Sequence, residues 1–386
     1  MAQTTIHTYH DVLDHLLDVC GSSSEERELK LARRAIESAY RVLPNEKKWS
    51  YFYKHFRITT DASYSTGTIT YDHTGGTNER EATLASGTWP TNAARGVIVI
   101  SNVPYHVETR VSDTVITLSI NSNPGGDLAA GTSYEWQRRL YTLPVDIQSA
   151  ERFIDHDESN SPAYVPPSDW LNSYQNYTSS NRPRTYTFLR DPDYRGAMAV
   201  GLHPAPDQVY KYEVMGQQQP VAMRTPNYTT GTVTVSGTTV TGVSTAWTDD
   251  MIGAVIRFGD ATNIPDGLAG TNPFAEERIV TARASATSLT IDAILSGTYS
   301  SATKYRISSM VDVEQGAMFT AFLRLAESEL SLLLNREDVD SREMRYKRSL
   351  VSAKEADSRS FADRSPGIDR SPYRLRNRGN AGADIG

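Results

Sequence analysis

Apolar residues near the N-terminal end of the chain recur every three to four positions, which is the spacing of an amphipathic helix. The first stretch places its apolar residues on one face: Tyr9, Val12, Leu13, Leu16 and Leu17. Thr8 precedes this stretch and Asp11 lies within its first turn, and the two form a pair typical of a capping box. A second stretch reaches Leu43 and stops before Pro44. The pattern predicts two N-terminal helices.

Helical spacing returns in the last quarter of the chain, first in a stripe of three apolar residues: Met318, Phe322 and Leu325. An excess of leucine follows between Leu330 and Leu334, which predicts a helix buried on most sides. Asp340, with Glu343 three residues later, predicts the start of a last helix that runs toward Ala356. Helices are therefore expected at both ends of the chain.

The long middle of the chain changes to alternation of apolar and polar residues and contains a repeat. Residues 64–70 match residues 228–234, and residues 107–118 align without a gap with residues 280–291. Trp89 precedes an apolar run in the first copy, as Trp247 does in the second. Each copy has roughly 80 residues, the length of a small antiparallel barrel or sandwich with the tryptophan as its core anchor. Convergence of Thr-, Ser- and Gly-rich sequence is the alternative explanation.

These patterns together predict an α+β fold, in which terminal helices form a bundle and bracket a β-rich region with two similar small antiparallel β-barrel or sandwich modules. The segment that follows the last helix is rich in Arg, Gly, Asn and Pro and has few apolar residues, so it is not expected to fold alone. The expected parts are N-terminal helices over 1–56, a first β module over 57–143, a central β and loop region over 144–223, a second β module over 224–311, C-terminal helices over 312–357 and an extended arm over 358–386.

Composition narrows the possible functions. The formal net charge is -7, so the chain lacks the positive field that drives non-specific binding of nucleic acid. Cys20 is the single cysteine, which excludes an internal disulfide framework and a zinc site built from several thiolates of one chain. Neither an apolar signal core nor a run of eighteen apolar residues occurs, so we expect a soluble chain that is not secreted through a signal peptide.

Two clusters in the sequence contain residue types that bind metals. The run Asp-His-Asp-Glu at 155–158 has suitable ligands, but four consecutive side chains cannot all converge on one ion. His7, His10 and Asp11 lie about one turn apart, where a solvated helix end is the simpler interpretation. Phosphate-binding loops, nucleophile elbows and zinc-protease motifs are absent from the sequence. We therefore expect no enzyme activity, no metal and no cofactor.

The region between the two β modules carries three turn motifs: Leu-Pro-Val-Asp at 143–146, Pro-Arg-Thr-Tyr at 183–186 and Pro-Ala-Pro-Asp-x-x-Tyr at 204–210. With the helical ends and the C-terminal arm, these motifs resemble the head-to-tail adaptor (connector) proteins of tailed phages, and most closely the tail-tubular-protein-A-like adaptors of short-tailed phages. The likeness extends over nearly the whole chain.

The resemblance implies a structural protein of the virion neck or tail that is assembled in the host cytoplasm. It implies a closed ring of identical chains, commonly twelve, that joins the portal protein to the tail nozzle or tube protein. Genomic DNA would pass through the lumen without sequence-specific binding, and no membrane would be involved. An acidic chain suits such a channel because it does not grip the phosphate backbone.

The arm is the expected partner-binding segment, since a polar segment with spaced apolar anchors can order itself on a partner's surface. The expected contact is with the portal or a neighbouring subunit, although most polar termini are simply solvated. The anchors and their flanking arginines are Phe361, Ile368, Tyr373, Arg374, Leu375 and Arg376.

Two other functions remain open from the sequence. Twin β modules with aromatic-rich loops are compatible with a receptor- or carbohydrate-binding tail accessory protein. A virion hydrolase would need the carboxylates of 155–158 to form a pair at a fixed separation in one cleft. The paired terminal helices favour the adaptor, because a glycan-binding module gains little from long helices that bracket it.

Overall fold

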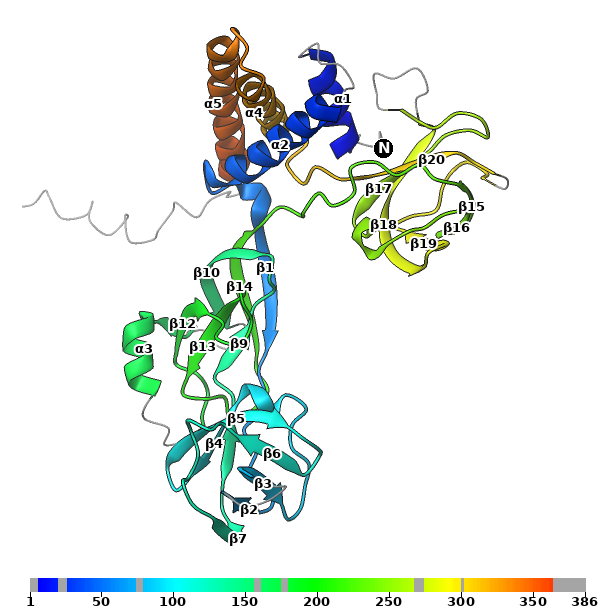
Figure 1. Cartoon of the computed structure of the whole chain (residues 1–386). Helices are drawn as coiled ribbons and strands as arrows, with labels where there is room; N and C mark the ends of the chain where they lie inside the picture. Colours follow the sequence, from blue (N-terminus) through cyan, green and yellow to red (C-terminus); the bar gives the residue numbers. More distant parts are fainter. Residues whose placement is uncertain are drawn as a thin grey trace, which may run out of the picture. The chain divides into compact units, whose positions relative to one another are not determined.

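The computed structural model describes residues 6–19, 26–73, 79–155, 161–174, 180–266, 274–299 and 302–363 (Figure 1). The chain forms two compact units: unit 1 comprises Met1–Tyr51 and Pro220–Gly386, and unit 2 comprises Phe52–Gln219. Unit 2 is thus an insertion in the sequence of unit 1. Helices and curled antiparallel sheets are both present, so the expected α+β class is confirmed. Within the described ranges, every helix is too short or too polar to cross a membrane.

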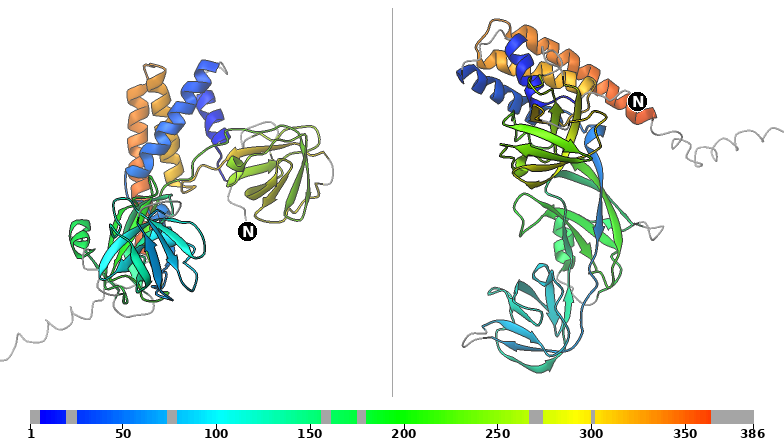
Figure 2. Two further views of the ribbon diagram at one scale, coloured as in Figure 1. Left: turned by 60° about the horizontal axis from the view of Figure 1, so that its bottom comes forward. Right: turned by 90° about the vertical axis from the view of Figure 1, so that its right-hand side faces the viewer.

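The helices of unit 1 come from both ends of the chain (Figure 2). They are α1 (Tyr9–Val19), α2 (Glu26–Val42), α4 (Ala317–Leu333) and α5 (Val339–Asp363), with the short 3₁₀ helices η1 (Leu43–Asn45) and η2 (Ser50–Phe52) after α2. The capping box of α1 is confirmed. The Thr8 backbone N–H donates to Asp11 Oδ2 at 2.9 Å, and the Asp11 N–H donates to Thr8 Oγ1 at 3.4 Å.

The four helices pack on one another through apolar faces. Helix α4 contacts α5, α2 and α1, and α1 also contacts α2. The buried face of α2 contains three small residues, Ala32, Ala35 and Ala39, which let a neighbouring helix approach closely, and the larger Ile36. Tyr40 then meets Phe322 of α4 edge to face, with ring centroids 5.9 Å apart.

The C-terminal helices differ from the expectation in two respects. Leu330 is buried, but Leu332 and Leu333 are 61% and 41% exposed, so the end of α4 is not buried on most sides. Leu332 lies about 200° around the helix from Leu330 and so points away from the buried face. Leu333 is the last residue of α4, where the helix ends. Helix α5 also continues to Asp363, so residues 358–363 are helical rather than part of an extended arm.

A buried carboxylate lies inside this helical layer. The side chain of Glu327 on α4 is 1% exposed, with Oε1 2.8 Å from His15 Nε2 on α1. Arg324 Nη1 donates to both carboxylate oxygens at 2.8 and 2.9 Å. Burial alone would raise the pKa of Glu327, but the hydrogen bonds from His15 and Arg324 outweigh it and lower the pKa.

This arrangement predicts an acid-sensitive contribution to stability. Because the pKa of Glu327 is lower in the folded chain, the unfolded state takes up the proton first as the pH falls below about 4.5. The stabilisation is therefore present at neutral pH and is lost on acidification. We expect Glu327→Gln to flatten this part of the pH dependence, measured as urea-unfolding free energy by helical circular dichroism from about pH 7 to about pH 3.5. Exposed Glu37→Gln is the control, and an equal flattening in both variants would contradict the assignment.

Each unit contains one large curled antiparallel sheet. The six-stranded sheet of unit 1 has the order β15-β16-β19-β18-β17-β20, and the seven-stranded sheet of unit 2 has the order β7-β2-β3-β6-β5-β4-β8. The strands of unit 1 are β15 (Thr232–Ser236), β16 (Thr239–Val243), β17 (Ala254–Phe258), β18 (Glu276–Ser285), β19 (Ser288–Ile291) and β20 (Tyr305–Ser309). Those of unit 2 are β2 (Ile69–Asp72), β3 (Glu81–Leu84), β4 (Val97–Ile100), β5 (Val103–Arg110), β6 (Val115–Leu118), β7 (Leu128–Thr132) and β8 (Glu135–Gln137).

The two sheets match strand by strand in the order of the sequence repeat. Val97 of β4 pairs with His106 and Gln137 on its two neighbours, as Val255 of β17 pairs with Ile279 and Ser308. The register of β5 on β6 shifts between residues 107 and 109, and that of β18 on β19 shifts at the corresponding place between 280 and 282. In the six-stranded sheet, a single bridge between Val233 and Thr303 takes the place of the pairing between β2 and β7 in the seven-stranded sheet. Strand order and one register shift therefore recur together.

Contacts around the two tryptophans recur as well. A tyrosine Oη accepts from a backbone N–H in both sheets: Tyr64 from Thr88 at 2.9 Å, and Tyr228 from Ala246 at 2.7 Å. An arginine donates to the carbonyl of each tryptophan: Arg110 to Trp89 at 3.1 Å, and Arg283 to Trp247 at 2.8 Å. A second tyrosine donates to a threonine carbonyl: Tyr134 to Thr66 at 2.8 Å, and Tyr305 to Thr230 at 2.6 Å. Gly67 and Gly231 have φ of +79° and +87°, where glycine is favoured, and a Cβ on either would lie 2.4 Å from a backbone oxygen. The same turn thus enters each sheet.

The remaining strands of unit 2 form two smaller sheets. One has the order β1-β14-β10 and the other β11-β12-β13-β9. The strands are β1 (Tyr53–Thr59), β9 (Leu140–Thr142), β10 (Ile147–Asp155), β11 (Ala163–Tyr164), β12 (Thr185–Arg190), β13 (Met198–His203) and β14 (Lys211–Gln218), and the helix α3 (Pro167–Tyr174) contacts β12 and β13. The two sheets share one apolar core that includes Phe153, Tyr212 and Val214 from the first and Tyr141, Tyr186 and Val200 from the second.

Two expected boundaries need correction. Strand β1 crosses the expected boundary between the helical range 1–56 and the first β module over 57–143, and β9 lies within 57–143. Both strands instead pair with central strands, β1 with β14 and β9 with β13. Such pairings join residues far apart in the sequence and leave no local pattern. The strands of the second sheet all lie within the expected range 224–311.

Candidate functional site

The predicted arm is only partly within the described residues. Phe361 lies in the last turn of α5, and its side chain is outside the description. The other five residues of the predicted contact, three anchors and two flanking arginines, also lie outside the described residues: Ile368, Tyr373, Arg374, Leu375 and Arg376. The surface of α5, which leads to the arm, is therefore the part of this region whose geometry can be stated.

Helix α5 has two opposite faces. One is buried against the other helices of unit 1 and includes Tyr346, Leu350 and Ala353. The opposite face, here called the α5 outer face, consists of Met344, Arg348, Val351 and Glu355, which recur at a spacing of three to four residues. Met344 and Val351 are 55% and 57% exposed. Two large apolar side chains therefore stand in one row on the outward face of the helix.

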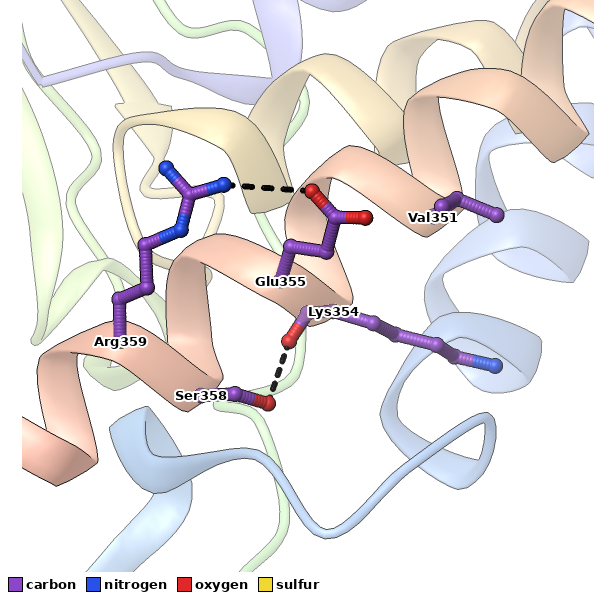
Figure 3. Close-up of a pocket in the computed structure, with 5 residues that line it drawn as sticks. All are labelled: Val351, Lys354, Glu355, Ser358 and Arg359. Atoms are coloured by element: carbon purple, nitrogen blue, oxygen red, sulfur yellow. Dashed lines mark hydrogen bonds and ion pairs between the residues drawn. The ribbon is translucent and has the colours of Figure 1, made fainter.

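A shallow groove lies at the C-terminal half of this face (Figure 3). It encloses about 470 Å³ and is lined by Val351, Lys354, Glu355, Ser358 and Arg359, all from α5. Arg359 forms an ion pair with Glu355 at 3.3 Å, and Ser358 Oγ donates to the Lys354 carbonyl at 2.7 Å. The Lys354 ammonium lies 3.1 Å from Glu46. The lining offers apolar contact and exposed charges to a protein surface, and Ser358 Oγ also accepts from Lys47 Nζ at 2.9 Å.

Other apolar side chains on the helices of unit 1 are also exposed. Leu332 and Leu333 end α4, Val19 ends α1 and Val42 ends α2. The apolar pattern assigns these leucines to a buried helix and so does not predict that they are exposed. The sequence does contain one sign of the α5 outer face. Met344 and Val351 do not share the helical face of Tyr346 and Leu350, which are buried.

The acidic run 155–158 does not form a site that can be described. Asp155 is buried, and its Oδ2 accepts from Arg182 Nη2 at 2.7 Å. Residues 156–158 lie outside the described residues, as does Cys20. Among the residues that are described, no group of three or more His, Cys, Asp or Glu side chains is arranged to hold a metal ion.

The cluster at the start of α1 is neither a metal site nor the solvated helix end that the sequence favoured. The Asp11 carboxylate accepts two hydrogen bonds of 2.7 Å from Arg257 of β17. The His7 ring stacks on Phe319 with centroids 3.9 Å apart, and the His10 backbone N–H donates to Ser308 Oγ at 3.1 Å. Burial lowers the pKa of both histidines. The sequence could not show these contacts, because the partners lie 246 or more residues later in the chain.

Comparison with known protein families, with curated proteins and with solved structures finds no match to this chain.

Proposed function

We propose that this chain is a structural protein of a tailed-phage virion, a head-to-tail adaptor that forms a ring between the portal and the tail nozzle or tube. The observation that supports it most is the helical layer of unit 1. Both ends of the chain contribute to that layer, and its surface exposes Met344 and Val351 on the α5 outer face and Leu332 and Leu333 at the end of α4.

A contact that removes such apolar area from water is stabilised by about 25 cal/mol for each Å² that it buries. In a closed ring, each chain presents one surface to its neighbour on one side and a different surface to the neighbour on the other. The α5 outer face would be one of these surfaces or would meet the portal. The arm that follows α5 would extend the same contact, in line with its expected role.

We further infer that the two large curled sheets are copies of one duplicated barrel-like module, because the strand order, one register shift and the tryptophan contacts recur together. In the adaptor they would contact the tail proteins. The net charge of -7 suits a ring through which DNA slides, since an acidic lumen does not hold phosphate.

The experiment that tests the proposal mixes the purified chain with the portal ring of the same virus and examines the product by negative-stain electron microscopy. We expect a second ring stacked on the portal, and a weaker stack with a chain that ends at Asp363, which keeps α5 whole. Free chains beside bare portals would contradict the adaptor and favour a receptor- or carbohydrate-binding accessory protein.

The α5 outer face gives this test a sharper form. We expect the double variant Met344→Glu and Val351→Glu to weaken ring assembly by about tenfold or more, because two apolar contacts are lost and two carboxylates would have to be desolvated. Helical circular dichroism should be unchanged, since both side chains point outward. The matched control is Val243→Glu, an exposed apolar residue on β16. Stacked rings of equal yield in both variants would exclude the face as an interface.

A further inference from the structure

Unit 2 contains a cleft of about 750 Å³ between its large sheet and its central sheets. One wall comes from β4, β5 and the loop after β6, and includes Val97, His106 and Asn121. The other wall comes from β9 and the loop between β12 and β13, and includes Asp193 and Tyr194. The volume lies within the range of roughly 300–1,000 Å³ that small-molecule sites occupy.

The second wall is held in place before any ligand arrives. Arg95, from the 3₁₀ helix η3 (Ala93–Arg95), donates to Asp191 Oδ2 at 2.7 Å and to Thr142 Oγ1 at 2.5 Å. The other oxygen of Asp191 accepts from the backbone N–H groups of Asp193 at 2.9 Å and Tyr194 at 3.1 Å. These bonds tie the loop to the large sheet, so the cleft is preorganised and a ligand need not order it.

The charges that line the cleft cancel. Arg95 and Arg139 are positive, and Glu108 and Asp193 are negative, so these four side chains sum to zero. Arg95 is paired with Asp191 and Asp193. Glu108 is paired with Arg80, at 2.7 Å. A phosphate or a carboxylate would find no net positive charge here to offset its desolvation, so the lining favours a neutral ligand.

The uncharged groups of the lining suit a ligand rich in hydroxyls. The Tyr194 side chain is 54% exposed, and its ring lies over the Arg95 guanidinium at 4.6 Å, which fixes its orientation. Asn121 adds an amide that both donates and accepts. At the floor, Gln137 is 1% exposed, and its Nε2 has no hydrogen-bond partner among the described residues. A ligand hydroxyl that reached it would satisfy a donor that is costly to leave unpaired.

The second large sheet serves as an internal control. By strand register, the positions of His106 and Gln137 correspond to Ile279 and Ser308. Three hydrogen bonds around the tryptophan recur in both sheets, so this part of the fold does not require His106. His106 stands where the second sheet has the apolar Ile279, whereas Gln137 corresponds to another polar residue, Ser308.

We propose that this cleft is a binding site for a neutral saccharide. A sugar ring presents one apolar C–H face, which an aromatic ring such as Tyr194 packs against, and a rim of hydroxyls that both donate and accept hydrogen bonds. The combination of an exposed tyrosine, amides, mutually paired charges and an unpaired buried donor matches that chemistry. The proposal goes beyond the adaptor function and does not depend on ring formation.

The test titrates the full-length chain with neutral methyl glycosides of glucose, galactose, mannose and N-acetylglucosamine, followed by saturation-transfer NMR. Glucuronic acid and N-acetylneuraminic acid are the charged probes. We expect saturation transfer to at least one neutral glycoside, and a rise of its Kd by about threefold to tenfold in Tyr194→Ala, as the loss of one aromatic contact predicts. Asn121→Ala should weaken the same glycoside.

The matched control is Tyr164→Ala, which removes an exposed tyrosine of β11 outside the cleft and should leave binding unchanged. Absence of transfer to every neutral glycoside would overturn the proposal, as would binding confined to the acidic sugars or binding that Tyr194→Ala leaves intact. A failed portal experiment together with saccharide binding that depends on Tyr194 would contradict the adaptor alone.

Discussion

Replacement of Arg257 by methionine is expected to lower the free energy of unfolding of unit 1 by about 3–5 kcal/mol. The Arg257 side chain is 1% exposed and donates to both oxygens of Asp11 at 2.7 Å. It also donates to Glu277 Oε2 at 3.1 Å and to the Ile6 carbonyl at 2.8 Å. Its removal would leave two carboxylates short of a positive partner in a largely buried place, which costs more than the pair itself is worth.

The same guanidinium joins two parts of unit 1 that lie far apart in the sequence. Asp11 lies in the first turn of α1, whereas Arg257 lies on β17, 246 residues later. Burial raises the pKa of Asp11, but the hydrogen bonds from Arg257 outweigh it and lower the pKa. We therefore expect the variant to loosen the start of α1 against the six-stranded sheet as well as to lower overall stability.

Urea unfolding at neutral pH measures the loss, and hydrogen exchange in α1 and β17 locates it. Arg224→Met is the matched control, because Arg224 forms an exposed pair with Asp250 at 3.0 Å and should change stability by about 1 kcal/mol or less. Adding Asp11→Asn and Glu277→Gln to the methionine variant should recover part of the loss. A variant of Arg257 that unfolds like the Arg224 control would show that the network contributes little.

Removal of either module tryptophan should cost about 3–5 kcal/mol, and should do so in one unit only. Trp247 in unit 1 is fully buried, with its Nε1–H donating to Tyr305 Oη at 3.0 Å and its ring meeting that tyrosine edge to face. Trp89 in unit 2 is equally buried, and its Nε1–H donates to the Thr114 carbonyl at 3.0 Å. Truncation of either side chain to alanine leaves a large cavity at the centre of its sheet.

The expected result follows from the division of the chain into two compact units, each with its own core. Hydrogen exchange should show loss of protection in β15–β20 for Trp247→Ala and in β2–β8 for Trp89→Ala. Conservative Trp247→Phe and Trp89→Phe variants, which retain most of the apolar volume, serve as controls and should cost less. Loss of protection in both units from a single alanine variant would mean that the units unfold together.

Local patterns in the sequence predicted a large part of this fold. The helices at both ends followed from apolar spacing and from the capping pair of Thr8 and Asp11, and the strands from alternation. The repeat pointed to Trp89 and Trp247 as core residues, and both are buried. These features are local, because a helix or a strand buries the face that its own residues make apolar.

The sequence was less informative about the candidate site. It placed the contact in the arm, where Phe361 is in α5 and the other anchors lie outside the described residues. It assigned Leu332 and Leu333 to a buried helix, although both are exposed. An apolar pattern indicates which residues favour burial, but not which face another element of the same chain covers.

The sequence by itself determined the α+β class, the helical ends, the tryptophan-centred repeat and the cap of α1, since each depends on residues close together in the chain. Only the tertiary structure decided that β1 and β9 join the central sheets, that Arg257 binds Asp11, and that a cleft whose charges cancel forms beside Tyr194. The physical reason is that these contacts join residues brought together by the fold, and their free energies depend on distance and burial in three dimensions.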